Sequence, residues 1–239
     1  MKSIENLKNG LKDGIAIALG YFPVSFTFGI MAVSLNIPTH ISVLVSLTNL
    51  TSAGQFAGLP LFVVDGAYIE MALTQLIINL RYALMSLSLS QKVDKNWKTL
   101  DRIILSFGIT DEIFAVSSNQ KQKVSRAYFL GLMILPIIGW TSGTFAGCVA
   151  SGLLPYKLQN ALGLAIYGMF LAIIIPPARK SKVVAGIIVI CFVLSYLASI
   201  LPVVSDISSG TRTIILTVGI SAVAAWLFPR ENQEVSDES

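Results

Sequence analysis

Two adjacent carboxylates lie near the centre of a short, mostly apolar segment. They are Asp111 and Glu112, within residues 103–118. Charged side chains at membrane depth are costly and usually have a function. A carboxyl group removed from water holds a proton more readily, so it can take up and release protons near neutral pH. We predict that these acids are proton-coupling residues. In the alternative, the segment is half exposed and the acids pair with nearby Lys or Arg.

A basic side chain lies inside another apolar stretch, residues 67–90. Arg81 follows Asn79 by two positions, and the fixed fork of guanidinium donors suits a carboxylate. That carboxylate would come from one of the two acids or from a substrate, and we predict that Asn79 and Arg81 are substrate-binding residues. The alternative is that Arg81 extends to the cytoplasmic surface, because it precedes Tyr82 and a series of serines.

Polar and small residues occupy the centre of residues 41–64, a run without charged side chains. They favour a broken or re-entrant helix, and irregular backbone at membrane depth is tolerated only where protein or a watery cavity satisfies it. A half-helix beginning there would offer backbone N–H groups to a carboxylate. The alternative is close packing between helices. The predicted substrate-binding residues of this stretch are Asn49, Thr51, Ser52, Gly54 and Gln55.

The elements that position these residues follow from composition. Hydrophobic residues make up 54% of the 239 residues and charged residues 13%, whereas soluble domains carry about 25% charged residues. A membrane span needs roughly 20 apolar residues. The runs without Lys, Arg, Asp or Glu that are long enough are 14–36, 41–64, 127–155 and 183–205.

We therefore expect an all-α, polytopic helical membrane protein with about 7–8 membrane segments. Residues 1–229 would form a single transporter domain, and residues 230–239 a disordered acidic tail. A shift of 117 positions aligns Ser25 with Ser142, with further matches nearby. This suggests two three-span repeats, 14–90 and 127–203, each with a broken or re-entrant second helix.

Charge in the loops predicts the orientation. Lys and Arg collect in residues 91–102, 119–126 and 179–182, and cytoplasmic loops carry such an excess. We expect both termini in the cytoplasm, with residues 3–13 as a short helix on the membrane surface. The N-terminus does not have the pattern of a signal peptide.

Several classes are disfavoured. The sequence has no His-Glu-x-x-His, phosphate-loop or Gly-x-Gly-x-x-Gly motif, so we expect no ATP-driven pump, no zinc enzyme and no cofactor. No nucleic-acid motif is present, and no nucleophile–base pair indicates an enzyme. Cys148 and Cys191 lie in apolar runs and are expected to pack as small hydrophobic residues.

Four short motifs indicate a family. They are Gly20-Tyr-Phe-Pro-Val-Ser-Phe-Thr-Phe-Gly29, Ser52-Ala-Gly-Gln-Phe-Ala57, Ile77-Ile-Asn-Leu-Arg-Tyr82 and Thr110-Asp-Glu-Ile-Phe114. In order and spacing these motifs resemble the AzlC family, also called the YgaZ type, over roughly residues 5–228.

This resemblance implies the large subunit of an exporter in the bacterial cytoplasmic membrane. Leucine, isoleucine and valine would be its substrates, with methionine or toxic analogues as further candidates. A small hydrophobic AzlD-type subunit would be its partner. Two other hypotheses stay open: a passive channel or facilitator that needs no titrating acid, and a non-transporting scaffold that stabilises a partner subunit.

Overall fold

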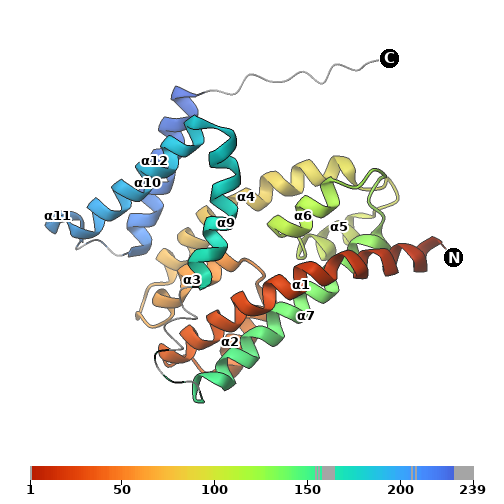
Figure 1. Cartoon of the computed structure of the whole chain (residues 1–239), viewed down its shortest axis with the longest axis horizontal. Helices are drawn as coiled ribbons and strands as arrows, with labels where there is room; N and C mark the ends of the chain where they lie inside the picture. The colour runs from red at the N-terminus through yellow and green to blue at the C-terminus, as the bar shows by residue number, and fades with distance from the viewer. Residues whose placement is uncertain are drawn as a thin grey trace. The chain divides into compact units, whose positions relative to one another are not determined.

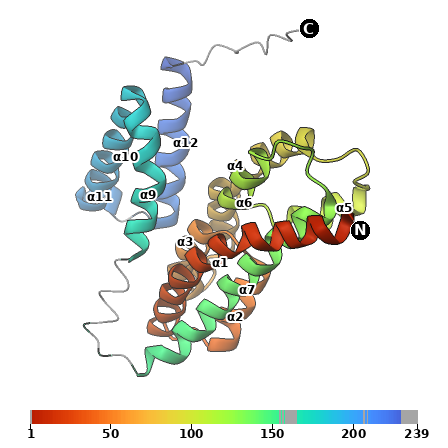
Figure 2. The same cartoon turned by 45° about the vertical axis from the view of Figure 1, so that its right-hand side comes forward.

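The chain is helical throughout the part that the structure describes. The computed structural model describes residues 2–153, 155, 157, 165–205, 207 and 209–228. Among these residues the β-structure is one isolated parallel bridge, between Val93 and Val124. The prediction of an all-α protein is confirmed. The chain divides into two compact units, Met1–Met169 and Phe170–Ser239, and each is described by itself (Figures 1 and 2).

Four of the described helices are long and apolar enough to cross a membrane. They are α1 (Lys2–Ser34), α4 (Tyr68–Lys92), α7 (Arg126–Ser151) and α10 (Lys182–Ile200). The chain is therefore a helical membrane protein. The described spans are fewer than the about 7–8 predicted segments. Residues 41–64 and 103–118 fold as pairs of short helices, the apolar part of α12 (Thr211–Leu227) is shorter than these four helices, and part of the predicted segment 158–177 lies outside the described residues.

Helices α1 and α7 pack side by side and run in the same direction (Figure 1). Near the start of both helices, Gly10 faces the backbone of Tyr128, and near their ends Gly147 faces the backbone of Phe26. A β-carbon at either glycine would collide with the facing carbonyl oxygen. Small residues let membrane helices approach this closely. The pair forms the frame of the first unit.

The predicted surface helix over residues 3–13 is wrong. Helix α1 continues without a break from Lys2 to Ser34. Its first turns already pack on α7, where Gly131 lies against the backbone of Leu7 and Leu11. The backbone at Leu7 and Leu11 therefore contacts α7, while Ile4 on the same apolar face stays 63% exposed.

The apolar stretch 41–64 is interrupted, as predicted. Helix α2 (Thr39–Thr48) ends at a C-cap with extended backbone, and α3 (Ser52–Phe62) begins after it. The interruption is Asn49–Thr51, which contains two residue types that readily satisfy backbone groups with their own side chains.

Helix α3 turns back along α2. The Gln55 amide donates a hydrogen bond to Ser46 at 3.1 Å, and Leu59 clusters with Ala32 and Val45. Ala32 belongs to the end of α1 that precedes α2, so α3 returns to the side from which α2 started. We call α2, Asn49–Thr51 and α3 the first hairpin.

A second hairpin enters from the opposite end of the unit. It consists of α5 (Thr99–Ser106) and α6 (Asp111–Ser118). Thr110, between them, contacts Tyr21 in the middle of α1. The residues that follow α6 line a cleft with the first turns of α1. The stretch 103–118 therefore reaches the middle of the unit and comes back.

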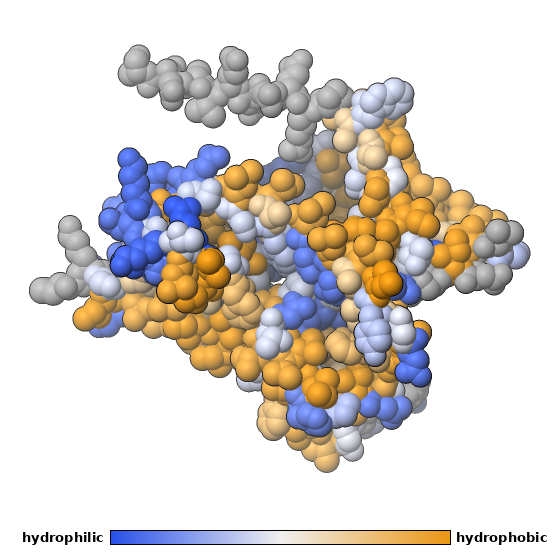
Figure 3. All heavy atoms as spheres, turned by 180° about the vertical axis from the view of Figure 1, so that it is seen from behind, coloured by the Kyte–Doolittle hydropathy of each residue, from blue (hydrophilic) through white to orange (hydrophobic). Residues whose placement is uncertain are grey.

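Polar residues gather where α1 begins. There the Lys123 ammonium donates to the Gln91 carbonyl at 2.7 Å, which ties two basic loops together. Figure 3 shows a hydrophilic patch at this end, with largely hydrophobic surface along the neighbouring helices.

Asp101 accepts the Lys98 backbone N–H at 2.8 Å and pairs with Arg126 at 3.0 Å. These contacts hold the pKa of Asp101 below its ordinary value.

The second unit consists of the later part of α9 (Ala165–Lys180), with α10, α11 (Pro202–Ser205) and α12 (Ser209–Leu227). Helices α10 and α12 lie side by side (Figure 2), and the Arg212 guanidinium donates to the Ala198 carbonyl at 3.1 Å. Residues 158–164 of the predicted second repeat, and the predicted acidic tail 230–239, lie outside the described residues.

Candidate functional site at the meeting of two hairpin tips

The tip of the first hairpin is held by side-chain hydrogen bonds. Thr51 caps α3 by accepting the Gly54 N–H at 3.2 Å, and its own N–H donates to Asn49 Oδ1 at 3.1 Å. The Thr51 hydroxyl donates to Asn79 Oδ1 on α4 at 2.5 Å. Four predicted site residues, Asn49, Thr51, Gly54 and Asn79, are thus brought together from two elements that are distant in sequence.

Gln75 completes this tip, and the sequence analysis missed it. Its amide nitrogen donates to the Gly54 carbonyl at 2.8 Å, and its oxygen accepts from Asn79 at 3.2 Å. A β-carbon at Gly54 would press against the end of the Gln75 side chain, which would have to shift from its present position. The signal was present, because Gln75 and Asn79 are four residues apart and share one face of α4.

Gln55 lies on the other side of α3, in a buried polar network with α7. The Trp140 indole N–H donates to Gln55 Oε1 at 2.6 Å, and the Gln55 amide donates to Ser46 at 3.1 Å. Ser46 in turn shares a hydrogen bond with Thr144 at 2.7 Å. Gln55 is 2% exposed. The structure places this predicted substrate ligand between helices, where it fixes the hairpin to the α1–α7 frame.

The tip of the second hairpin is held by Tyr21 of α1. The Tyr21 hydroxyl lies 2.6 Å from Thr110 Oγ1 and 2.5 Å from Glu112 Oε2. Thr110 is also the N-cap of α6 and accepts the Ile113 N–H at 3.4 Å. The Tyr21 ring meets the Trp140 ring edge to face at 5.4 Å. The two tips are therefore joined through a pair of aromatic side chains.

An ion pair joins the second tip to α4. The Arg81 guanidinium lies 3.0 Å from Asp111 Oδ2, which is one of the pairings that the sequence suggested. It also lies 5.1 Å from the centre of the Tyr82 ring. The Arg81 and Asp111 side chains are 37% and 34% exposed, so the ion pair is only partly buried. Arg81 Nε is buried and has no hydrogen-bond partner.

A cavity of about 230 Å³ lies between the two tips and α4. This is smaller than the roughly 300–1,000 Å³ of sites for drug-sized ligands, so the cavity suits a small molecule. Of the predicted substrate-binding residues, Ser52, Gly54, Gln55 and Arg81 do not line it. Its lining residues are Thr48, Asn49, Leu50, Thr51, Asn79, Tyr82, Ser106, Phe107 and Ile109.

The hairpins meet the three long helices of the first unit near the middle of each helix. Tyr21, Arg81 and Trp140, which contact residues of the hairpins, are close to the midpoints of α1, α4 and α7, respectively. Both α3 and α6 begin at this level, and the start of a helix carries partial positive charge on its unpaired N–H groups. Amide and hydroxyl groups lie on one wall, and Leu50, Phe107 and Ile109 contribute apolar surface.

The comparison with known proteins agrees with the family resemblance of the four sequence motifs. The sequence profile described as "AzlC protein" matches residues 16–154, which is more than half of the chain and includes both hairpins. The chain belongs to the AzlC family. Every residue of the hairpin tips and of the cavity lies inside the matched region.

Curated relatives of this AzlC-family chain are membrane proteins. An uncharacterized membrane protein of Archaeoglobus fulgidus is 29% identical over 81% of this chain and 87% of its own length. The inner membrane protein YgaZ of Escherichia coli is 26% identical over 72% of this chain and 74% of its own length. An uncharacterized membrane protein of Helicobacter pylori is 24% identical, over 66% and 69%, respectively. No solved structure matches the chain.

Proposed function

We propose that this chain is a secondary transporter that exports branched-chain amino acids, together with a small AzlD-type subunit. The observation that carries the proposal is the cavity between the two opposed hairpin tips. Discontinuous helices near the middle of the membrane are typical substrate sites of secondary transporters. Family membership supports the same reading.

The cavity has the chemistry that an aliphatic amino acid needs. Asn49, Thr51 and Asn79 offer amide and hydroxyl groups to the ammonium and carboxylate, and the helix beginning at Ser52 favours an anion. Arg81 is the nearby cation that would meet the carboxylate as it moves between the tips. Leu50 and the apolar residues of the second tip would face the side chain.

Proton coupling is assigned to the second tip, with different tasks for its two acids. Asp111 is paired with Arg81, so its charge is compensated within the protein. Glu112 is hydrogen-bonded by the neutral hydroxyl of Tyr21, which leaves its charge without a bonded cation. We therefore assign the uptake and release of the coupled proton to Glu112. Asp111 would hold the Arg81 guanidinium in place.

The membrane arrangement that goes with this function has about 7–8 segments in all, counting each hairpin as a membrane segment. The start of α1 and the basic loops after α4 and α6 would lie in the cytoplasm, as the excess of Lys and Arg indicates. The membrane would be the bacterial cytoplasmic membrane, and residues 1–229 would act as one transporter domain.

The test is efflux of preloaded labelled leucine from cells that express this chain, with and without the small subunit, at two external pH values. We expect faster efflux with both chains, and a rate that changes with external pH. An efflux rate that does not depend on external pH, and is unchanged by Glu112→Gln, would favour the passive facilitator. Unchanged fluxes of leucine, isoleucine and valine, with both chains present in the membrane, would reject the substrate assignment.

A further inference from the structure

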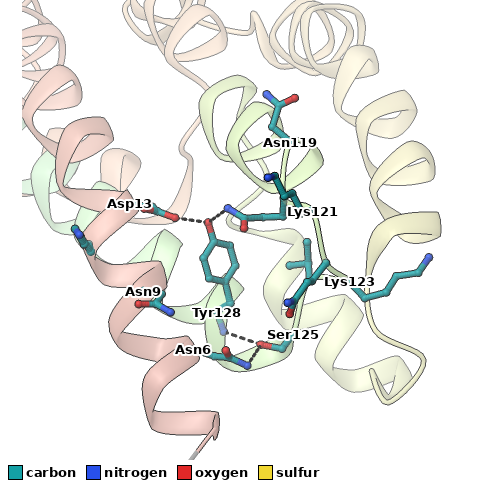
Figure 4. A pocket seen from close by; sticks show the side chains of 12 residues that line it. Asn6, Asn9, Asp13, Asn119, Lys121, Lys123, Ser125 and Tyr128 are labelled. Carbon is teal, nitrogen blue, oxygen red and sulfur yellow. Dashed lines mark hydrogen bonds between the residues drawn. The ribbon is translucent and has the colours of Figure 1, made fainter.

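A polar cleft opens at the end of the first unit where α1 begins (Figure 4). It has a volume of about 510 Å³ and lies between the first turns of α1 and the loop after α6. Tyr128 crosses it: its hydroxyl donates to Asp13 Oδ2 at 2.6 Å and accepts from the Gln120 amide at 2.5 Å. Lower in the cleft, Asn6 donates to Ser125 at 3.0 Å.

A second cavity continues the cleft between α1 and α6. It has a volume of about 530 Å³, and four of its lining residues also line the first cavity: Lys12, Asp13, Asn119 and Gln120. Its further lining residues, Ala16, Ala115 and Val116, extend it toward the middle of the unit. We call the two cavities together the α1–α6 groove.

The inner end of the α1–α6 groove lies close to the second hairpin tip. Ala115 follows Glu112 by three residues, and Ala16 precedes Tyr21 by five, so each is about one helical turn from the Tyr21–Glu112 hydrogen bond. The groove therefore leads from the end of the unit toward the carboxylate that we assign to proton coupling.

The mouth of the groove fits water better than lipid. It carries charged and amide side chains on both walls, and such groups are costly in hydrocarbon. Farther in, the lining consists of Ala16, Ala115 and Val116, and both alanines are exposed. Lys12 and Asp13 lie together at the mouth and offer opposite charges, which match the two charged groups of a zwitterion.

We infer that the α1–α6 groove is a water-filled entrance from the side on which α1 begins, and that zwitterionic amino acids pass Lys12 and Asp13 there on their way to the hairpin tips. The inference about the substrate rests on the proposed function. The inference about water does not, and it can be tested without any substrate.

The test is cysteine accessibility in the full chain in membrane vesicles, after Cys148→Ala and Cys191→Ala. The probe is a membrane-impermeant, cationic methanethiosulfonate reagent. Ala16→Cys and Ala115→Cys report on the groove, and Val116→Cys serves if either variant fails to insert. The matched control is Leu19→Cys, because Leu19 is 71% exposed on the same helix but lines none of the cavities described above.

We expect the groove cysteines to react at least tenfold faster than the control from the side that holds the N-terminus, and slowly from the other side. Reaction no faster than at position 19, or faster from the other side, would overturn the entrance. Leucine should slow the reaction at position 115. Fast labelling without protection by leucine would support the water-filled groove while counting against the proposed substrate.

Discussion

The close contact between α1 and α7 makes a quantitative prediction for two glycines. The three atoms nearest a β-carbon at Gly147 would all be backbone atoms of Phe26, which cannot move aside as a side chain can, so the helices must separate. Overpacking of this kind costs typically 1–3 kcal/mol, against about 0.8–1.0 kcal/mol that Ala gains over Gly in a helix. Gly147→Ala should therefore lower the free energy of unfolding by up to about 2 kcal/mol, and by about 1–3 kcal/mol relative to a glycine whose β-carbon has room.

Gly20 on α1 is the matched control, because a β-carbon there would meet nothing within 4 Å. Gly20→Ala should be neutral or slightly stabilising, by up to about 1 kcal/mol. The assay is unfolding of both purified variants in mixed micelles, titrated with a denaturing detergent and followed by tryptophan fluorescence. Equal stability of the two variants would refute the close backbone contact between α1 and α7.

Three further predictions concern the site and its surroundings. Asn79→Leu leaves buried polar partners unsatisfied at a cost of about 1–3 kcal/mol, and leucine efflux should fall at least tenfold while the chain still inserts; full efflux would contradict the site. Glu112→Gln should abolish the response of efflux to external pH, and an unchanged response would move the proton elsewhere. The lowered pKa of Asp101, caused first by the Lys98 N–H and then by Arg126, means that its stabilising contribution is present above the ordinary aspartate pKa and is lost as pH falls through the lowered value. Asp101→Asn should therefore reduce the fall in melting temperature as the pH is lowered, and only modestly, because the pair is exposed. An unchanged dependence of melting temperature on pH would show that the pair contributes nothing.

The sequence predicts the parts of the site that depend on local chemistry. Asn49 and Thr51 interrupt an apolar stretch because their side chains compete for backbone hydrogen bonds, and the break occurs there. An intramembrane Arg81 needs a carboxylate, and it finds Asp111. Both conclusions follow from the cost of unsatisfied polar groups at membrane depth.

The parts that depend on long-range packing could not be predicted. Gln55 is adjacent to the cavity in sequence but is bonded to Trp140, 85 positions away, and local spacing cannot reveal such a partner. Tyr21 was not among the predicted site residues, because its role comes from meeting Glu112, 91 positions away. The first turns of α1 resembled a surface helix for the same reason, since the α7 glycine that lies against their backbone, Gly131, is distant in sequence.

The shared direction of α1 and α7 imposes a parity rule on everything between them. Two parallel helices start on the same side only if the intervening chain crosses back an odd number of times, and α4 supplies that one crossing, while each hairpin supplies none. An insertion that turned either hairpin into a complete crossing would therefore invert all later segments. In the second hairpin, which lies between the basic loops that Lys123 and Gln91 now join, it would also separate those loops. Hairpins of this kind can lengthen, shorten or diverge in sequence during evolution without changing which side of the membrane any other loop occupies.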